Sequence, residues 1–230
     1  MTWLQKRAYL LGTASLGILA LGAYLGLIWA PQDIYQHNVM RIMYVHVPSA
    51  MLCYLGFFIT LVGSILYLWK RDLKWDRLAA ASAELGVLFT ALTLATGSIW
   101  GKPVWGVFWT WDPRLTTTAI LFVVYAGYLM LRILQTDPVV RARQAAVVGI
   151  IGFVDIPIVH QSVVWWRSLH QGPTFPLLQD PKLDDRMEVA LMVNALGFAL
   201  AFLFLLGQRL RLARLEGQRD ELLWEEVQRV

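Results

Sequence analysis

Six apolar blocks, each 19 to 23 residues long with at most one charged residue, run through this 230-residue chain. A helix needs about 20 such residues to cross the hydrocarbon core of a bilayer. Lipid offers no partner to backbone polar groups, so an apolar run of this length is expected to be helical. The blocks are residues 8–30, 47–69, 79–100, 115–134, 145–166 and 189–207. They predict an all-α integral membrane protein with six transmembrane helices.

Composition agrees with this prediction. Hydrophobic residues make up 57% of the chain and charged residues 16%, whereas a soluble domain carries about 25% charged residues. The first block is longer than the apolar core of a signal peptide, which has about 7–15 residues. We therefore expect it to be the first membrane helix.

The distribution of positive charge predicts the orientation. Of the 20 Lys and Arg residues, 14 lie at the two ends and in the links between helices two and three and between helices four and five. The positive-inside rule places these segments, and hence both termini, in the cytoplasm. Residues 1–207 would form the membrane domain and 208–230 a cytoplasmic tail, either helical or solvated. The pI of about 9.3 then reflects topology, and no nucleic acid partner is predicted.

Histidine and tryptophan collect on the opposite, outer side, in the loops at 31–46, 101–114 and 167–188. This side holds all four histidines, namely His37, His46, His160 and His170. The stretch "WGKPVWGVFWTWDPRLT" carries Trp100, Trp105, Trp109 and Trp111, and Trp165 and Trp166 border the third outer loop. Trp also favours membrane interfaces, and residues 105–112 could form a helix lying on the surface. Four indoles within twelve residues favour a ligand platform between helices three and four.

Prolines predict three local features. Asp112 and Pro113 fit an N-cap followed by proline at the first position of helix four, so Asp112 would orient the loop. Pro48 would start helix two in the same way and place His46 at its mouth. Pro157 would kink helix five. Nearby Asp155 would either serve a proton path or ligand, or form an interhelix hydrogen bond.

Haem fits the predicted outer surface, because it is large, flat and apolar and its iron accepts histidine. His46 and His170 come from different loops and could approach the two faces of the ring. The indoles of Trp100, Trp105, Trp109 and Trp111 could stack on it. Cations that could pair with the propionates are Arg41, Lys102, Arg114 and Arg167. A quinone or a lipid would satisfy part of this chemistry.

The tryptophan stretch resembles the signature of the haem-handling protein superfamily of cytochrome c biogenesis. Within that superfamily, the chain is similar to the CcmC family, the haem-handling C component of the cytochrome c maturation system. The resemblance extends to "RIMYVHVPSAM" and "VDIPIVHQSVVWWRSLHQGPT", and it covers nearly the whole chain before the tail. It implies that His46 and His170 are the axial ligands and that Trp100 to Asp112 form the haem platform. His160, Trp165 and Trp166 fit the pattern as secondary site residues.

The resemblance also implies a task and partners. Such a protein receives haem b at the outer, periplasmic face of the bacterial plasma membrane. It presents the haem for covalent attachment to a histidine of a membrane-tethered haem chaperone, as a presentation protein rather than a classical enzyme. A small single-span accessory protein and an ABC-type ATPase complex would be partners. Two other classes stay open, namely a cytochrome b-like electron-transfer subunit and a small transporter with an aromatic lid.

Overall fold

The computed structural model describes residues 3–170 and 183–228, with side chains for 8–170 and 183–219. Its helices are α1 (Trp3–Tyr24), α2 (Met43–Lys70), α3 (Leu73–Trp105), α4 (Pro113–Leu134), α5 (Pro138–Phe153), α6 (Asp155–Trp165) and α7 (Asp185–Gln228). A π-helical turn, η1 (Leu25–Trp29), ends α1, and a 3-10 turn, η2 (Asn38–Ile42), leads into α2. Among the described residues, six helical stretches are long and apolar enough to span a membrane, with α5 and α6 forming one of them. The predicted all-α, six-helix membrane protein is confirmed.

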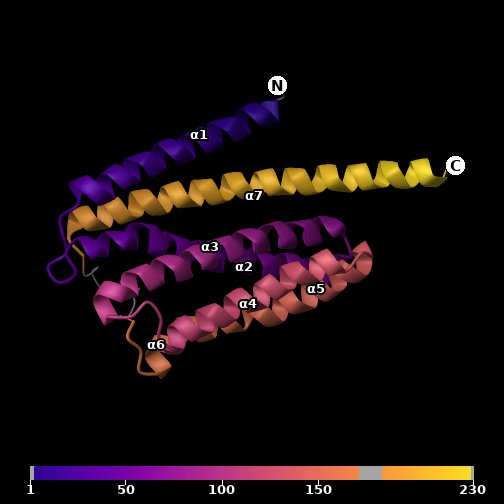
Figure 1. Cartoon of the computed structure of the whole chain (residues 1–230). Coiled ribbons are helices and arrows are strands. Elements are labelled where there is room, and N and C mark those ends of the chain that lie inside the picture. Colours follow the sequence, from indigo (N-terminus) through magenta and orange to yellow (C-terminus); the bar gives the residue numbers. More distant parts are fainter. Residues whose placement is uncertain (1–2, 171–182, 229–230) are drawn as a thin grey trace.

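The helices run side by side along the length of the molecule (Figure 1). The start of α1 and the end of α7 lie at one end of this bundle, as an even number of crossings requires. At the other end lie α6 and the connections at 30–42, 106–112 and 166–170. We call this the histidine end, because His37, His46, His160 and His170 belong to these segments or to the helix ends beside them. Helix α7 continues without a break to Gln228, so the segment after the last apolar block is helical.

Small residues allow the central helices to approach closely. A Cβ added to Gly56 of α2 would lie 3.0 Å from the Gly86 backbone of α3, and one added to Gly86 would lie 2.4 Å from the Phe57 ring. Phe57 in turn stacks on Tyr125 of α4, with ring centroids 3.7 Å apart. Close backbone approach of this kind is how helices associate in lipid, where no hydrophobic effect drives them together.

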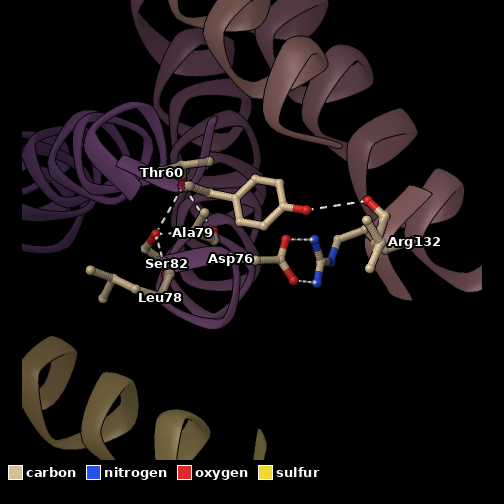
Figure 2. A network of polar contacts seen from close by, with 8 residues as sticks. Thr60, Asp76, Leu78, Ala79, Ser82 and Arg132 are labelled. Carbon is tan, nitrogen blue, oxygen red and sulfur yellow. Dashed lines mark hydrogen bonds and ion pairs between the residues drawn. The ribbon is translucent and has the colours of Figure 1, made fainter. Parts of the chain in front are cut away.

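Among the residues whose side chains the structure describes, ion pairs join helices α3 and α4 and helices α3 and α7 at the end opposite the histidines. Arg132 of α4 donates from Nη1 and Nη2 to the two carboxylate oxygens of Asp76 on α3, at 2.6 and 2.9 Å (Figure 2). The Asp76 side chain is buried and that of Arg132 is largely so, and their fork-to-fork geometry is the strongest form of such a pair. A second pair joins α7 to α3, because Arg209 Nη2 donates to Glu84 Oε1 at 2.9 Å. The sequence analysis predicted neither pair.

Beside the Asp76 pair, buried hydroxyl groups connect α2 to α3. Thr60 Oγ1 and Ser82 Oγ are 2.9 Å apart, and both contact the Ala79 carbonyl oxygen (Figure 2). Within its own helix, the Thr60 hydroxyl also contacts the Gly56 carbonyl oxygen, and the Ser82 hydroxyl contacts that of Leu78. Neither hydroxyl is therefore left without a partner. This network and the glycine contacts hold α2 and α3 in one relative register.

Two predictions of helix ends are wrong. Helix α2 starts at Met43 and contains Pro48, because η2 has already wound the chain before the proline is reached. Helix α3 extends to Trp105 and ends at Gly106, whose φ of 82° is the left-handed conformation that terminates helices. Residues 107–112 are therefore not a surface helix. As a consequence, His46 and Trp105 lie on helices rather than in loops.

The predicted break in the fifth membrane crossing is confirmed. Helix α5 ends at Phe153, four residues before Pro157, where the proline ring would clash with the carbonyl of a continuing helix. The chain restarts as α6 at Asp155. The Asp155 Oδ2 atom is buried and has no hydrogen-bond partner among the described residues, so no interhelix hydrogen bond is seen there. The break lets α6 pack on α4 at the histidine end.

Candidate functional site

A cavity of about 610 Å³ opens at the histidine end. Its size falls in the range of about 300–1,000 Å³ that is usual for small-molecule sites. Its walls come from helices α2, α3, α4 and α6 and from the connections that carry Gln36, Trp109 and His170. The lining includes seven of the predicted site residues, namely His46, Trp100, Trp105, Trp109, Arg114, His160 and His170. We call it the histidine cavity.

His46 enters this cavity from the first turns of α2. Its Nδ1 atom lies 3.0 Å from Thr96 Oγ1 of α3. The ring of Trp100 meets the imidazole edge-on, with centroids 5.6 Å apart. Gly97 allows this approach, since an added Cβ there would lie 3.1 Å from the imidazole Cε1 atom. The sequence analysis missed Thr96 and Gly97, which look like ordinary membrane-helix residues in the sequence.

Trp100 is itself oriented from the first connection. Its Nε1 atom donates to the Gln36 side-chain oxygen at 2.7 Å. Gln36 belongs to a tight turn in which Asp33 Oδ1 accepts from the Tyr35 and Gln36 backbone N–H groups at 2.9 and 2.6 Å. This turn thus connects residues before α2 with the wall formed by α3.

His170 enters the cavity from the segment that follows α6. Its ring lies beside Trp105, with centroids 5.1 Å apart. Its Nδ1 atom is buried and has no hydrogen-bond partner among the described residues. Burial lowers the pKa of this imidazole to about 4, and the Arg114 cation adds to this effect while the Asp112 carboxylate opposes it. The ring is therefore neutral at ordinary pH, as a metal ligand must be.

Asp112 forms the cap that the sequence predicted, and a second contact that it did not. Its side chain accepts from the Arg114 backbone N–H at 2.9 Å at the start of α4, with Pro113 at the first helical position. The same buried carboxylate accepts from Ser168 Oγ at 3.1 Å and from the Leu169 N–H at 2.7 Å. Ser168 Oγ in turn accepts from the His170 N–H at 3.0 Å. Asp112 therefore holds the segment that carries His170.

Replacing Asp112 by alanine should release this segment. The cap contributes about 1 kcal/mol, and hydrogen bonds to a charged group contribute about 1.5–3 kcal/mol each. Their loss should raise the reactivity of His170 toward diethyl pyrocarbonate at least tenfold, measured by mass spectrometry on the purified chain. Trp111→Ala is the matched control, because Trp111 is 80% exposed and does not line the cavity. Equal reactivity in the two variants would show that Asp112 does not hold the segment.

The other predicted site residues lie outside the cavity lining. The Arg41 guanidinium donates to the carbonyl oxygens of Gly26 and Ala30 and so fastens the end of α1. Lys102 donates to the Gly106 carbonyl at the end of α3. Three further residues are exposed at the histidine end, namely Trp165, Trp166 and Arg167. Of the four predicted cations, the structure thus brings only Arg114 to the cavity wall.

The cavity can hold a flat, largely apolar ligand that takes nitrogen donors. Three imidazoles from separate elements, three indoles and one guanidinium share its walls. Among the described residues, the buried Nδ1 atom of His170 has no hydrogen-bond partner that would account for its burial. This donor set fits haem, whose iron accepts two imidazoles.

Comparison with known proteins gives one consistent result. The family model described as "CcmC: Heme exporter protein C" matches residues 1–225. A protein named Heme exporter protein C from Bradyrhizobium diazoefficiens is 38% identical over 221 residues, covering 94% of this chain and 79% of the relative. Proteins of the same name from Haemophilus influenzae and Escherichia coli are 38% and 37% identical, covering 97% and 87% of this chain and 88% and 81% of the relatives.

Proposed function

The chain belongs to the heme exporter protein C family, and from this premise we propose that it binds haem in the histidine cavity and presents it for covalent attachment to a membrane-tethered haem chaperone. The family supports a role in haem handling for cytochrome c maturation. The acceptor and the covalent attachment are part of our proposal. Haem is then a cargo that passes through the site, and the transferred form is haem b.

One observation carries this proposal. Residues from segments more than a hundred positions apart, His46 and His170, line the same cavity together with Trp100, Trp105 and Trp109. His46 and His170 are the proposed axial ligands, and the indoles are the surfaces on which the porphyrin stacks. A cytochrome b-like carrier would hold its haem at mid-membrane depth, whereas both of these histidines lie at the histidine end.

Arg114 is the proposed partner of a haem propionate. It lines the cavity, and its guanidinium suits a carboxylate better than a lysine does. Lys102 and Arg167 lie at the same end of the molecule, where they could meet a second propionate at the rim. Arg41 is committed to the Gly26 and Ala30 carbonyls and contributes by holding the first connection in place.

We place the histidine end at the periplasmic face of a bacterial plasma membrane, as the charge distribution predicts. An ABC-type export complex, a single-span accessory protein and the tethered chaperone are the proposed partners. Trp111 is 80% exposed beside the cavity and would be free to meet the chaperone.

Reporter fusions test this orientation. A reporter fused after Trp75, in the first turn of α3, should be active only in the cytoplasm. One fused after Gln179, in the segment outside the described residues, should be active only in the periplasm. The physical reason is the excess of Lys and Arg at the termini and near Trp75. Activity of both fusions on the same side would contradict the six-helix orientation.

A spectrum of the purified protein tests haem binding, and Trp105 provides its sharpest variant. The wild type should show a low-spin haem spectrum with about one haem per chain. Trp105→Ala should lower haem occupancy severalfold while membrane insertion stays intact, because stacking on an aromatic ring is lost at the His170 side. Trp165→Ala is the control, since that indole is exposed and does not line the cavity. Lost insertion with unchanged haem per folded molecule would identify Trp105 as an interface anchor instead.

A further inference from the structure

The two proposed ligands are held very differently. His46 lies on a continuous membrane helix, with Nδ1 at 3.0 Å from Thr96 Oγ1 and the Trp100 ring against its edge. His170 lies on a connecting segment that is tied to the bundle through backbone contacts to Ser168 and Asp112. Its ring has a neighbour in Trp105, but its buried Nδ1 atom has no hydrogen-bond partner in the part of the chain that the structure describes.

The Thr96 contact determines which nitrogen of His46 can bind a metal. A threonine hydroxyl has one hydrogen to donate. Thr96 Oγ1 lies 2.7 Å from the Leu92 carbonyl oxygen and 3.3 Å from that of Thr93, and both carbonyls can only accept. With its hydrogen directed to a carbonyl of its own helix, the Thr96 oxygen is an acceptor for a hydrogen on Nδ1 of His46. The lone pair of the neutral ring is then on Nε2, which has no hydrogen-bond partner among the described residues, and His46 lines the histidine cavity.

No equivalent contact orients His170 within residues 8–170 and 183–219, whose side chains the structure describes. Its Nδ1 atom is buried without a partner, and no described residue determines which ring nitrogen carries the proton. A ligand whose second nitrogen donates to a protein acceptor is more basic and better oriented than one without this bond, and removing such a partner typically costs about 10- to 100-fold in metal affinity. Imidazole bound through His46 should therefore hold iron more firmly than imidazole bound through His170.

We infer that Thr96 is a positioning residue that makes His46 the axial ligand retained in the first step of handover, and that His170 is the ligand exchanged in that step; this inference rests on the proposed function. The bond between iron and His46 breaks afterwards, when the haem leaves the cavity, and its electron pair stays on the imidazole. In the exchange, the bond between iron and the His170 nitrogen breaks and its electron pair stays on the imidazole. A neutral donor of the acceptor supplies the electron pair of the new bond. No electron or proton is transferred, so the oxidation state of the iron does not change.

Carbon monoxide provides the test, because it replaces one axial ligand of ferrous haem and reports on the ligand that stays opposite to it. The full chain is purified in detergent, loaded with haem, reduced and exposed to carbon monoxide. The iron–carbon and carbon–oxygen stretching frequencies are then measured. Thr96→Val removes the hydroxyl with little change in shape, and Thr96→Ser restores it.

We expect Thr96→Val to shift both frequencies and to lower haem affinity about tenfold or more, whereas Thr96→Ser matches the wild type in both. His170→Ala should give a carbon monoxide complex with wild-type frequencies, and His46→Ala should not. His37→Ala is the histidine control, because His37 does not line the cavity. A merely structural effect of Thr96 would lower the amount of folded protein without moving the frequencies.

Two results would overturn this inference. One is that Thr96→Val leaves the frequencies of the complex unchanged. The other is that His46→Ala, rather than His170→Ala, reproduces the wild-type complex, which would make His170 the retained ligand. If neither the wild type nor any variant bound haem, the proposed function itself would be wrong. The absorption spectrum recorded before carbon monoxide is added distinguishes that case from a failure of this inference alone.

Discussion

A chain carrying both His46→Ala and His170→Ala is expected to bind no haem and, for that reason, to capture no haem chaperone. Both imidazoles line the same cavity, and no other described histidine except His160 does so. Without them, stacking on indoles is the main attraction left, and apolar contact alone discriminates weakly between flat ligands. We expect haem content per folded chain to fall at least a hundredfold, measured by absorbance and by pyridine haemochrome.

Co-purification of the chaperone shows whether haem bridges the two proteins or whether they bind each other directly. A tagged chaperone should co-purify with the wild type and be lost from the double variant. Trp111→Ala is the informative comparison, because this indole is exposed and lies outside the cavity. It should keep haem and lose part of the chaperone. Capture of the chaperone by the haem-free double variant at the wild-type level would show that haem does not bridge the two proteins.

The second large effect is expected far from the cavity, at the buried pair of Asp76 and Arg132. Its two hydrogen bonds are 2.6 and 2.9 Å long, and both side chains are largely withdrawn from the surface. Removing one partner of a buried pair leaves an uncompensated charge and costs about 3–5 kcal/mol. Asp76→Ala should therefore lower the free energy of unfolding by about this amount, measured by titration with denaturing detergent.

The double variant Asp76→Leu, Arg132→Met shows whether the pair itself is stabilising. Replacing both charges by apolar groups of similar volume is often neutral or stabilising. We expect it to recover most of the stability lost in Asp76→Ala. Haem content per folded chain should be unchanged in both variants, since the pair lies at the end opposite the histidines. Equal stability of Asp76→Ala and the wild type would contradict the assigned role.

The sequence determined the membrane fold because lipid leaves few alternatives. A run of about 20 apolar residues must be helical, and six such runs return the chain to the side on which it began. The same reasoning predicted which connections hold the histidines and tryptophans, and the Asp112 cap and the break before Pro157 followed from local backbone chemistry. These features depend on residues close together in the chain.

The tertiary structure alone decided which side chains meet. Thr96 faces His46 across 50 positions of sequence, and Asp112 reaches Leu169 across 57. Arg41 and Lys102 looked equivalent to Arg114 in the sequence. In the structure, however, Arg41 donates to the Gly26 carbonyl and Lys102 to the Gly106 carbonyl. Such contacts depend on how far each helix is rotated about its axis and where it crosses its neighbour. Packing at small residues such as Gly56 and Gly86 sets that rotation, and hydrophobic patterning does not report it, because lipid-facing and buried positions of a membrane helix are equally apolar.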